Sequence, residues 1–199
     1  MDKALLEWIS LSGRLLGTLF YYSPNEQQAQ TVLSLFSEPE WEQQWSIQHS
    51  EIPALIAKGL KQNISRDYQA LFIGPNELLA PPWSSVYLDK ESVIFGESLL
   101  NLREFLHEHQ IAFSLNTNEP EDHFGLMLML SAYLAENKPQ LLTGYLGRYL
   151  LNWAYRYLDL LTEQKDYPFY QGLALLAKDT LCSWQEQANI EVISSQLYR

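Results

Sequence analysis

Hydrophobic residues recur three and four positions apart along most of the chain, which is the spacing of amphipathic helices. In the first such segment Leu5, Ile9, Leu16 and Phe20 fall near one helix face, and the pattern stops at Tyr21-Tyr22-Ser23-Pro24. No stretch shows the sustained alternation that is typical of a strand. The pattern therefore predicts an all-α fold, a single irregular helical domain over residues 1–199. Further helices are expected over residues 50–63, 65–73, 97–109, 119–136, 140–164 and 167–187, with Gly147 as a possible division in the fifth.

Several of these helices are preceded by capping signals. The segments 23–26 and 37–40 each place a serine three residues ahead of a glutamate, with a proline between them, which is the pattern of a capping box. Asp166 stands where it would cap the helix over residues 167–187. Asn118 stands where it would cap a helix that begins at Glu119. These positions predict where four helices start.

One long stretch interrupts the helical pattern. Residues 74–89 read GPNELLAPPWSSVYLD, and their three prolines and one glycine predict an irregular loop. Loops of this length inside a compact domain are often functional. Pro81-Pro82-Trp83 holds an aromatic ring on stiff backbone, and upstream Tyr68, Leu71 and Phe72 share one helix face. Rigid aromatic residues of this kind anchor many peptide interfaces. They can equally pack the loop onto the body of the protein.

Composition narrows the class of protein. The chain has 199 residues, of which 47% are hydrophobic, and a formal net charge of −11, so it is globular and poorly suited to nucleic acid. A cationic partner is favoured instead. The apolar run Leu126–Ala135 is too short to cross a bilayer, and Glu7 and Arg14 interrupt the first apolar segment, unlike in a signal peptide. The lone Cys182, expected in the core, allows no internal disulfide. We expect a cytoplasmic protein without stable membrane insertion.

Residues 118–125 read NEPEDHFG and gather three carboxylates with a histidine. Carboxylates are favourable near a helix start, so a cap explains them but leaves His123 unexplained. Asp122 and His123 are adjacent and diverge on a helix, and no second His or Cys stands at ligand spacing, so no metal is expected. A small hydrolase that uses Asp122 and His123 stays an alternative, although no nucleophile is visible. No phosphate-binding or dinucleotide motif predicts a cofactor.

Four stretches, taken in order, resemble the TorD/DmsD family of cytoplasmic redox-enzyme maturation chaperones. They are LFYYSPNE, LFIGPNELLAPPWSSVYLDKESVIFG, NEPEDHFG and DYPFYQGLALLAKDTL, and the resemblance covers nearly the whole chain. The most specific element is Glu119-Pro120-Glu121-Asp122-His123. Residues 81–91 are similar to the DmsD branch, which serves dimethyl sulfoxide reductase. Asn76 stands where we expect a tryptophan in close relatives.

The resemblance implies an all-helical chaperone with neither catalytic residues nor a cofactor. Its partner would be the twin-arginine signal peptide of a molybdoenzyme catalytic subunit, expected to be that of dimethyl sulfoxide reductase. The chaperone would hold this client back from the Tat translocon until molybdenum cofactor insertion is complete. Trimethylamine N-oxide reductase or another exported molybdoenzyme is an alternative client. GTP binding is associated with parts of the family, but no phosphate cradle is visible here. A monomer is expected.

The resemblance also implies a peptide-binding pocket. We expect Asp122 and neighbouring acids, Glu119 and Glu121 among them, to receive the arginine end, because guanidinium pairs with carboxylates bidentately. The apolar end would lie against Trp83, Phe72 and Leu71. His123 is expected to shape the pocket through a hydrogen bond to Asp122 or to backbone rather than to act as a pH switch. The signal-peptide-binding set is Tyr22, Tyr68, Leu71, Phe72, Pro82, Trp83, Glu119, Asp122 and His123.

Overall fold

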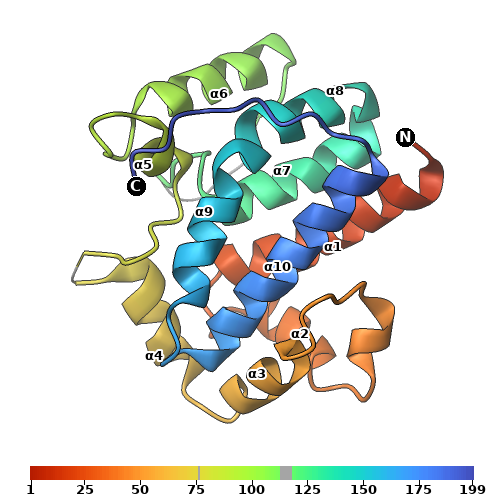
Figure 1. Cartoon of the computed structure of the whole chain (residues 1–199), viewed down its shortest axis with the longest axis vertical. Helices are drawn as coiled ribbons and strands as arrows, with labels where there is room; N and C mark the ends of the chain where they lie inside the picture. Colours follow the sequence, from red (N-terminus) through yellow and green to blue (C-terminus); the bar gives the residue numbers. More distant parts are fainter. Residues whose placement is uncertain (76, 113–117) are drawn as a thin grey trace.

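The computed structural model describes residues 1–75, 77–112 and 118–199, so Asn76 lies outside the described residues. The described residues form helices and no named strand, which confirms the expected all-α fold (Figure 1). One 3₁₀ turn, η1 (Trp41–Gln44), and two π-helical turns, η2 (Gln69–Ile73) and η3 (Leu146–Leu150), join the α-helices. The α-helices are α1 (Lys3–Tyr21), α2 (Gln27–Leu35), α3 (Ile52–Gly59), α4 (Ile64–Tyr68), α5 (Ser84–Leu88), α6 (Glu97–Glu108), α7 (Phe124–Asn137), α8 (Pro139–Tyr145), α9 (Leu151–Thr162) and α10 (Pro168–Gln187).

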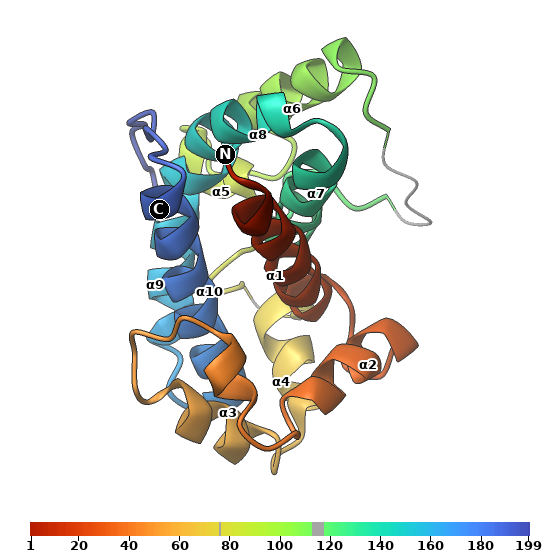
Figure 2. The same ribbon diagram turned by 90° about the vertical axis from the view of Figure 1, so that its right-hand side faces the viewer.

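The centre of the fold is the pair of helices α1 and α7, and α10 packs against α1 (Figures 1 and 2). Glycines let the first two helices approach closely. A Cβ atom on Gly17 would lie 2.7 Å from the carbonyl oxygen of Gly125, and one on Gly13 would lie 2.8 Å from that of Leu128. Helix α7 is buried on most of its surface, as its LMLML run predicts. None of the helices in the described ranges combines the length and the apolar composition of a membrane span.

Residues 190–199 run as an extended segment across the surface between α6 and α9 (dark blue in Figure 1). The N–H of Ile193 donates to the carbonyl of Gly147 at 3.0 Å, and the N–H of Tyr198 donates to that of Tyr87 at 2.9 Å. A Cβ atom on Gly147 would lie 2.2 Å from the carbonyl oxygen of Glu191. Gly147 therefore gives the segment room to pass. The helix predicted over 140–164 is divided around it into α8, η3 and α9.

Several predicted helix starts are wrong. The N–H of Ser23 donates to Oε1 of Glu26 at 2.8 Å, as in a capping box, but α2 begins only at Gln27. The box over residues 37–40 does not form, because Glu40 has a left-handed backbone with φ of 61° and only η1 follows. No side chain caps α10, so Asp166 does not have its predicted role. The last two predictions failed because a suitable residue type does not fix the backbone around it.

The other predicted boundaries differ for tertiary reasons. The helix expected from Glu119 begins at Phe124, so Asn118 is not its cap. The irregular stretch over residues 74–89 contains the short helix α5. The helices expected over 50–63 and 65–73 are shorter or change type, as α3 and as α4 followed by η2. Cys182, expected in the core, is only partly buried.

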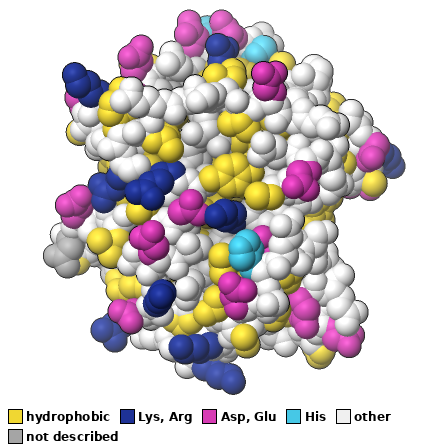
Figure 3. Space-filling view, in the orientation of Figure 1, with side chains coloured by type: hydrophobic (Ala, Val, Ile, Leu, Met, Phe, Trp, Pro, Cys, Tyr) yellow, Lys and Arg dark blue, Asp and Glu magenta, His cyan; other side chains and the backbone are white. Residues whose placement is uncertain are grey.

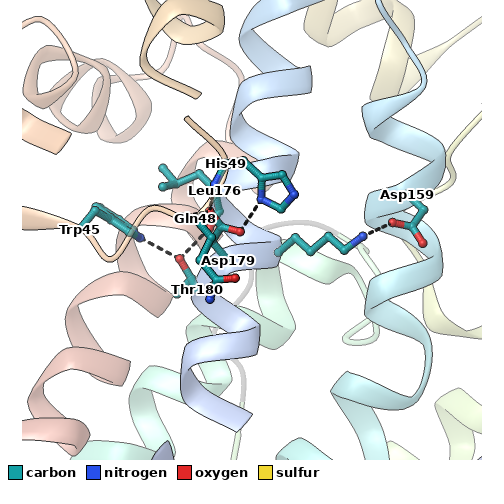
Figure 4. A network of polar contacts seen from close by, with 8 residues as sticks. Trp45, Gln48, His49, Asp159, Leu176, Asp179 and Thr180 are labelled. Carbon is teal, nitrogen blue, oxygen red and sulfur yellow. Dashed lines mark hydrogen bonds and ion pairs between the residues drawn. The ribbon is translucent and has the colours of Figure 1, made fainter. Parts of the chain in front are cut away.

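Asp179, a buried residue of α10, holds residues 45–49 against that helix through hydrogen bonds (Figure 4). Oδ2 of Asp179 accepts the backbone N–H groups of Gln48 at 2.7 Å and His49 at 3.0 Å, and Oδ1 lies 2.6 Å from Nδ1 of His49. Beside it, Nε1–H of Trp45 donates to Oγ1 of Thr180 at 2.7 Å. These bonds replace the helical hydrogen bonds that an irregular segment lacks.

Candidate functional site

Two segments far apart in sequence meet at the candidate site. The N–H of Phe124 donates to the carbonyl of Pro82 at 2.7 Å, and the N–H of Ser84 donates to the carbonyl of Asp122 at 3.2 Å. Between these bonds Trp83 and His123 form an isolated antiparallel bridge. The proline-rich loop and the NEPEDHFG stretch are therefore one structural unit, fixed by backbone hydrogen bonds.

Asp122 caps α5 from the interior. Its side chain is fully buried, and Oδ2 accepts the N–H of Ser85 at 2.9 Å and the hydroxyl of Ser84 at 3.1 Å. Burial raises the pKa of this carboxyl, while the hydrogen bonds from Ser85 and Ser84 lower it. The other oxygen, Oδ1, has no hydrogen-bond partner among the described residues. A guanidinium in solvent does not reach this carboxylate in the structure as it stands.

His123 caps α7. Its ring is 4% exposed, and Nδ1 accepts the N–H of Gly125 at 3.1 Å. Of the two predicted hydrogen bonds, the bond to backbone is the one that forms. Burial lowers the pKa of the imidazole to about 3, so the ring is neutral at physiological pH, which also fits its role as an acceptor.

Tyr21 links several of the predicted residues through its ring and its backbone carbonyl. The ring of Tyr21 lies 5.4 Å from that of His123 and 4.9 Å from that of Tyr22, measured between centroids. Its carbonyl accepts the Tyr68 hydroxyl at 2.6 Å. The ring of Trp83 lies 6.0 Å from that of His123, measured between centroids. Sequence reasoning missed the linking role of Tyr21, although the paired tyrosines at the end of α1 marked the position.

The predicted apolar wall is mostly core. Leu71 and Phe72 are each 4% exposed, and Tyr68 is 8% exposed. Phe72 stacks on Tyr68 with centroids 5.0 Å apart and contacts Tyr170 at the same distance. Pro82 is also buried. The partly exposed members of the predicted set are Tyr22, Trp83 and Glu119.

Glu119 joins the exposed part of the site to its interior. Its Oε1 accepts the indole N–H of Trp83 at 2.6 Å. Burial raises the pKa of Glu119, the Trp83 hydrogen bond lowers it, and the charge of Asp122 raises it further. Glu121 is paired with Arg103, whose Nη2 lies 2.7 Å from its Oε2. Of the acids expected to meet arginine, Glu119 therefore presents the more available carboxylate.

The site has no visible hydrolytic or metal-binding arrangement in the described ranges. The hydrogen bonds found there join Asp122 to Ser84 and Ser85 rather than to His123, so the two form no acid–base pair. No group of three or more His, Cys, Asp or Glu residues in those ranges could hold a metal ion. The arrangement offers a ring, a carboxylate and a rigid backbone, which suit recognition of a peptide.

The chain is similar to known chaperones over nearly its full length. It is 55% identical to a Tat proofreading chaperone DmsD of Haemophilus influenzae, with 98% of each chain covered. It is 39% identical to the Tat proofreading chaperone DmsD of Salmonella typhi, with 96% of this chain and 95% of that one covered. The family model for the nitrate reductase delta subunit matches residues 38–159.

A solved structure shares the fold. This is a redox enzyme maturation protein of Archaeoglobus fulgidus, 20% identical, with a TM-score of 0.56 over 85% of this chain and 92% of that one. The chain belongs to the TorD/DmsD family of Tat proofreading chaperones, which the nitrate reductase delta subunit model also describes. Its relatives are chaperones, so the protein is a chaperone and not an enzyme, and the hydrolase alternative is dropped.

Proposed function

We propose that this protein binds the twin-arginine signal peptide of the dimethyl sulfoxide reductase catalytic subunit in the cytoplasm. It would act as a monomeric single domain and hold the client back from the Tat translocon until molybdenum cofactor insertion and folding are complete. The observation that carries the proposal is the Trp83–Glu119 pair, a partly exposed ring hydrogen-bonded at 2.6 Å to a partly exposed carboxylate. The names of the relatives support it at the level of the family.

The nine residues of the signal-peptide-binding set would act in two ways. Trp83, Tyr22 and Glu119 would touch the peptide, because they are the ones that solvent reaches. The six buried members would hold these three in place. Asp122 and His123 would hold the two crossing segments together. The other four buried residues, Tyr68, Leu71, Phe72 and Pro82, would support the exposed side chains by packing. This division favours Trp83 as the residue whose loss weakens binding most directly.

The energetics favour moderate affinity. Covering roughly 300 Å² of apolar leader surface would contribute about 7 kcal/mol. Ordering a flexible peptide costs several kcal/mol of that. A dissociation constant of about 1 μM corresponds to about −8 kcal/mol, so contacts to the arginines are needed as well. Such an affinity suits a chaperone that later releases its client.

The test is a calorimetric titration with the leader of a dimethyl sulfoxide reductase catalytic subunit. We expect micromolar or tighter binding that weakens when Lys-Lys replaces Arg-Arg, because lysine cannot pair bidentately. Trp83→Ala should weaken binding about 10-fold or more. Trp41→Ala is the matched control, since Trp41 is also partly exposed but lies in η1, outside the set.

Each outcome decides a separate part of the proposal. Binding of the trimethylamine N-oxide reductase leader in preference to the first would keep the mechanism and change the client. Equal weakening by both tryptophan variants would remove Trp83 from the binding surface. Failure to bind any twin-arginine leader would overturn the proposed function.

A further inference from the structure

A cavity of about 730 Å³ lies beside the candidate site, between α5, α6, η3, α9 and the extended segment 190–199. Pockets that hold ligands typically measure about 300–1,000 Å³. Ser84 lines this cavity and adjoins Trp83 in the sequence, while none of the nine residues of the signal-peptide-binding set lines it. The cavity is therefore a neighbouring space, separate from the pocket that the sequence predicts.

The cavity carries an excess of negative charge. Asp89, Glu97, Glu104 and Glu108 line it, against the single cation Arg148, so negative charges exceed positive ones by three. Figure 3 shows several acidic side chains at the upper end of the molecule, over α6 of Figure 1, with basic and histidine side chains among them. Asp89 is already engaged, because it accepts the N–H and the hydroxyl of Ser98. The other three carboxylates, those of Glu97, Glu104 and Glu108, have no such partner among the described residues.

These glutamates occupy one face of α6, seven and four residues apart. All three are exposed, and within the described ranges their carboxylates make neither a hydrogen bond nor an ion pair. Like charges four residues apart, as in Glu104 and Glu108, destabilise a helix. A cation in the cavity would relieve this repulsion.

Two further features of the wall suit a guanidinium group. Oδ1 of Asn152, a residue that lines the cavity, is buried and has no hydrogen-bond partner in the described part of the chain. Rotation of the Asn152 amide, which now donates through Nδ2 to the Arg148 carbonyl and the Ser195 hydroxyl, would present this acceptor to a guanidinium in the cavity, which offers five N–H donors. The rings of Phe105 and Tyr149 also line the space with centroids 5.1 Å apart, and arginine stacks favourably on such rings.

We propose that this cavity receives the arginine pair of the client's leader peptide, an inference that rests on the proposed function. Glu104 and Glu108 pair with the guanidinium groups, and Phe105 and Tyr149 form the stacking wall. The apolar part of the leader then extends toward Trp83, the sequence neighbour of Ser84, which lines the cavity. Asp122 does not take this role, since its carboxylate is fully buried under α5.

A pair of double variants with equal charge change tests the assignment. Glu104→Gln/Glu108→Gln removes two carboxylates from the cavity, and Glu38→Gln/Glu163→Gln removes two exposed carboxylates elsewhere. We expect the first to weaken binding of the Arg-Arg leader about 3- to 10-fold and to flatten its salt dependence. The second should change affinity less than about 2-fold. Thermal unfolding of both variants checks that each is folded.

Other patterns overturn the inference. An equal loss in both double variants would mean that only net charge matters, and no loss in either would leave the cavity without a role. If the wild type binds the leader and Trp83→Ala abolishes binding while the cavity variant binds normally, the proposed function stands and the inference falls. No binding to the wild type removes the proposed function itself.

A crosslink with the unaltered protein gives an independent answer. A leader with a photoreactive phenylalanine analogue beside the arginines is irradiated in complex, and the attached residue is found by mass spectrometry. Attachment within residues 97–108 or 148–152 supports the assignment. Attachment confined to residues 118–123 would return the arginines to the pocket that the sequence predicts.

Discussion

Oδ2 of Asp122 lies 2.9 Å from the backbone nitrogen of Ser85, so one residue of the family's most specific motif caps a helix in the proline-rich loop. The same carboxylate accepts the hydroxyl of Ser84. These contacts join the two motifs in space. Each supplies hydrogen-bonding groups that the other needs, and the exposed side chains beside them are held in fixed positions.

Asp122→Asn should lower stability and leave the electrostatics of leader binding unchanged. Asparagine keeps an acceptor for the Ser85 N–H, so we expect a loss of about 1 kcal/mol in the free energy of unfolding. Asp122→Ala leaves that buried donor unpaired and should lose about 2–3 kcal/mol. Urea unfolding measures both values. A flatter salt dependence of leader binding in Asp122→Asn would contradict the buried position and indicate direct contact with arginine.

The protein should lose stability as the pH falls below 6.5 because of His123. The pKa of this histidine is about 3 in the folded chain and about 6.5 when exposed, so the unfolded chain binds the extra proton between these values. The folded state is therefore disfavoured by roughly 2 kcal/mol at pH 5 relative to pH 7. His123→Asn keeps a helix-capping acceptor and cannot titrate. Its unfolding free energy should change less between these pH values, and equal pH dependence in both proteins would contradict the assignment.

Gly17→Ala should destabilise the fold by preventing close approach of α1 and α7. The added Cβ would lie 2.7 Å from the carbonyl oxygen of Gly125, a backbone atom that cannot move alone. We expect the melting temperature to fall by about 3–10 °C. Gly144→Ala is the matched control, because a Cβ there meets nothing within 4 Å. Alanine favours the helix, so this variant should melt at a slightly higher temperature. A similar loss in both would show that helix contact is not the cause.

Asp179→Ala should release residues 45–49 from α10. Two backbone N–H groups would lose their acceptor, at a cost of about 2–3 kcal/mol in the free energy of unfolding. Amide hydrogen exchange of Gln48 and His49 should accelerate more than exchange in α7. His49→Ala keeps the two backbone bonds and should show a smaller effect. Equal losses in the two variants would indicate that the imidazole contact dominates.

The sequence was sufficient for the helical character of the fold and for the family. Helical spacing depends on residues three and four apart, so α1, α6 and α10 could be predicted from local pattern. The motifs around residues 81–91 and 118–125 carried the family resemblance, which the similarity to known chaperones confirmed. The existence of each helix was easier to predict than its first residue.

The helix starts and the exposure of the site residues came only from the fold. Helix α5 is capped by Asp122, and the two are separated along the chain by residues 89–121, a distance that no local capping pattern covers. Asp122 and His123 are polar and looked available in the sequence, but the crossing of the two segments buries them. Likewise, only the tertiary structure shows that the acidic face of α6 lines a cavity, because segment 190–199 forms another wall of that space. Periodicity records which side of a helix is apolar, whereas burial depends on which distant segment packs there.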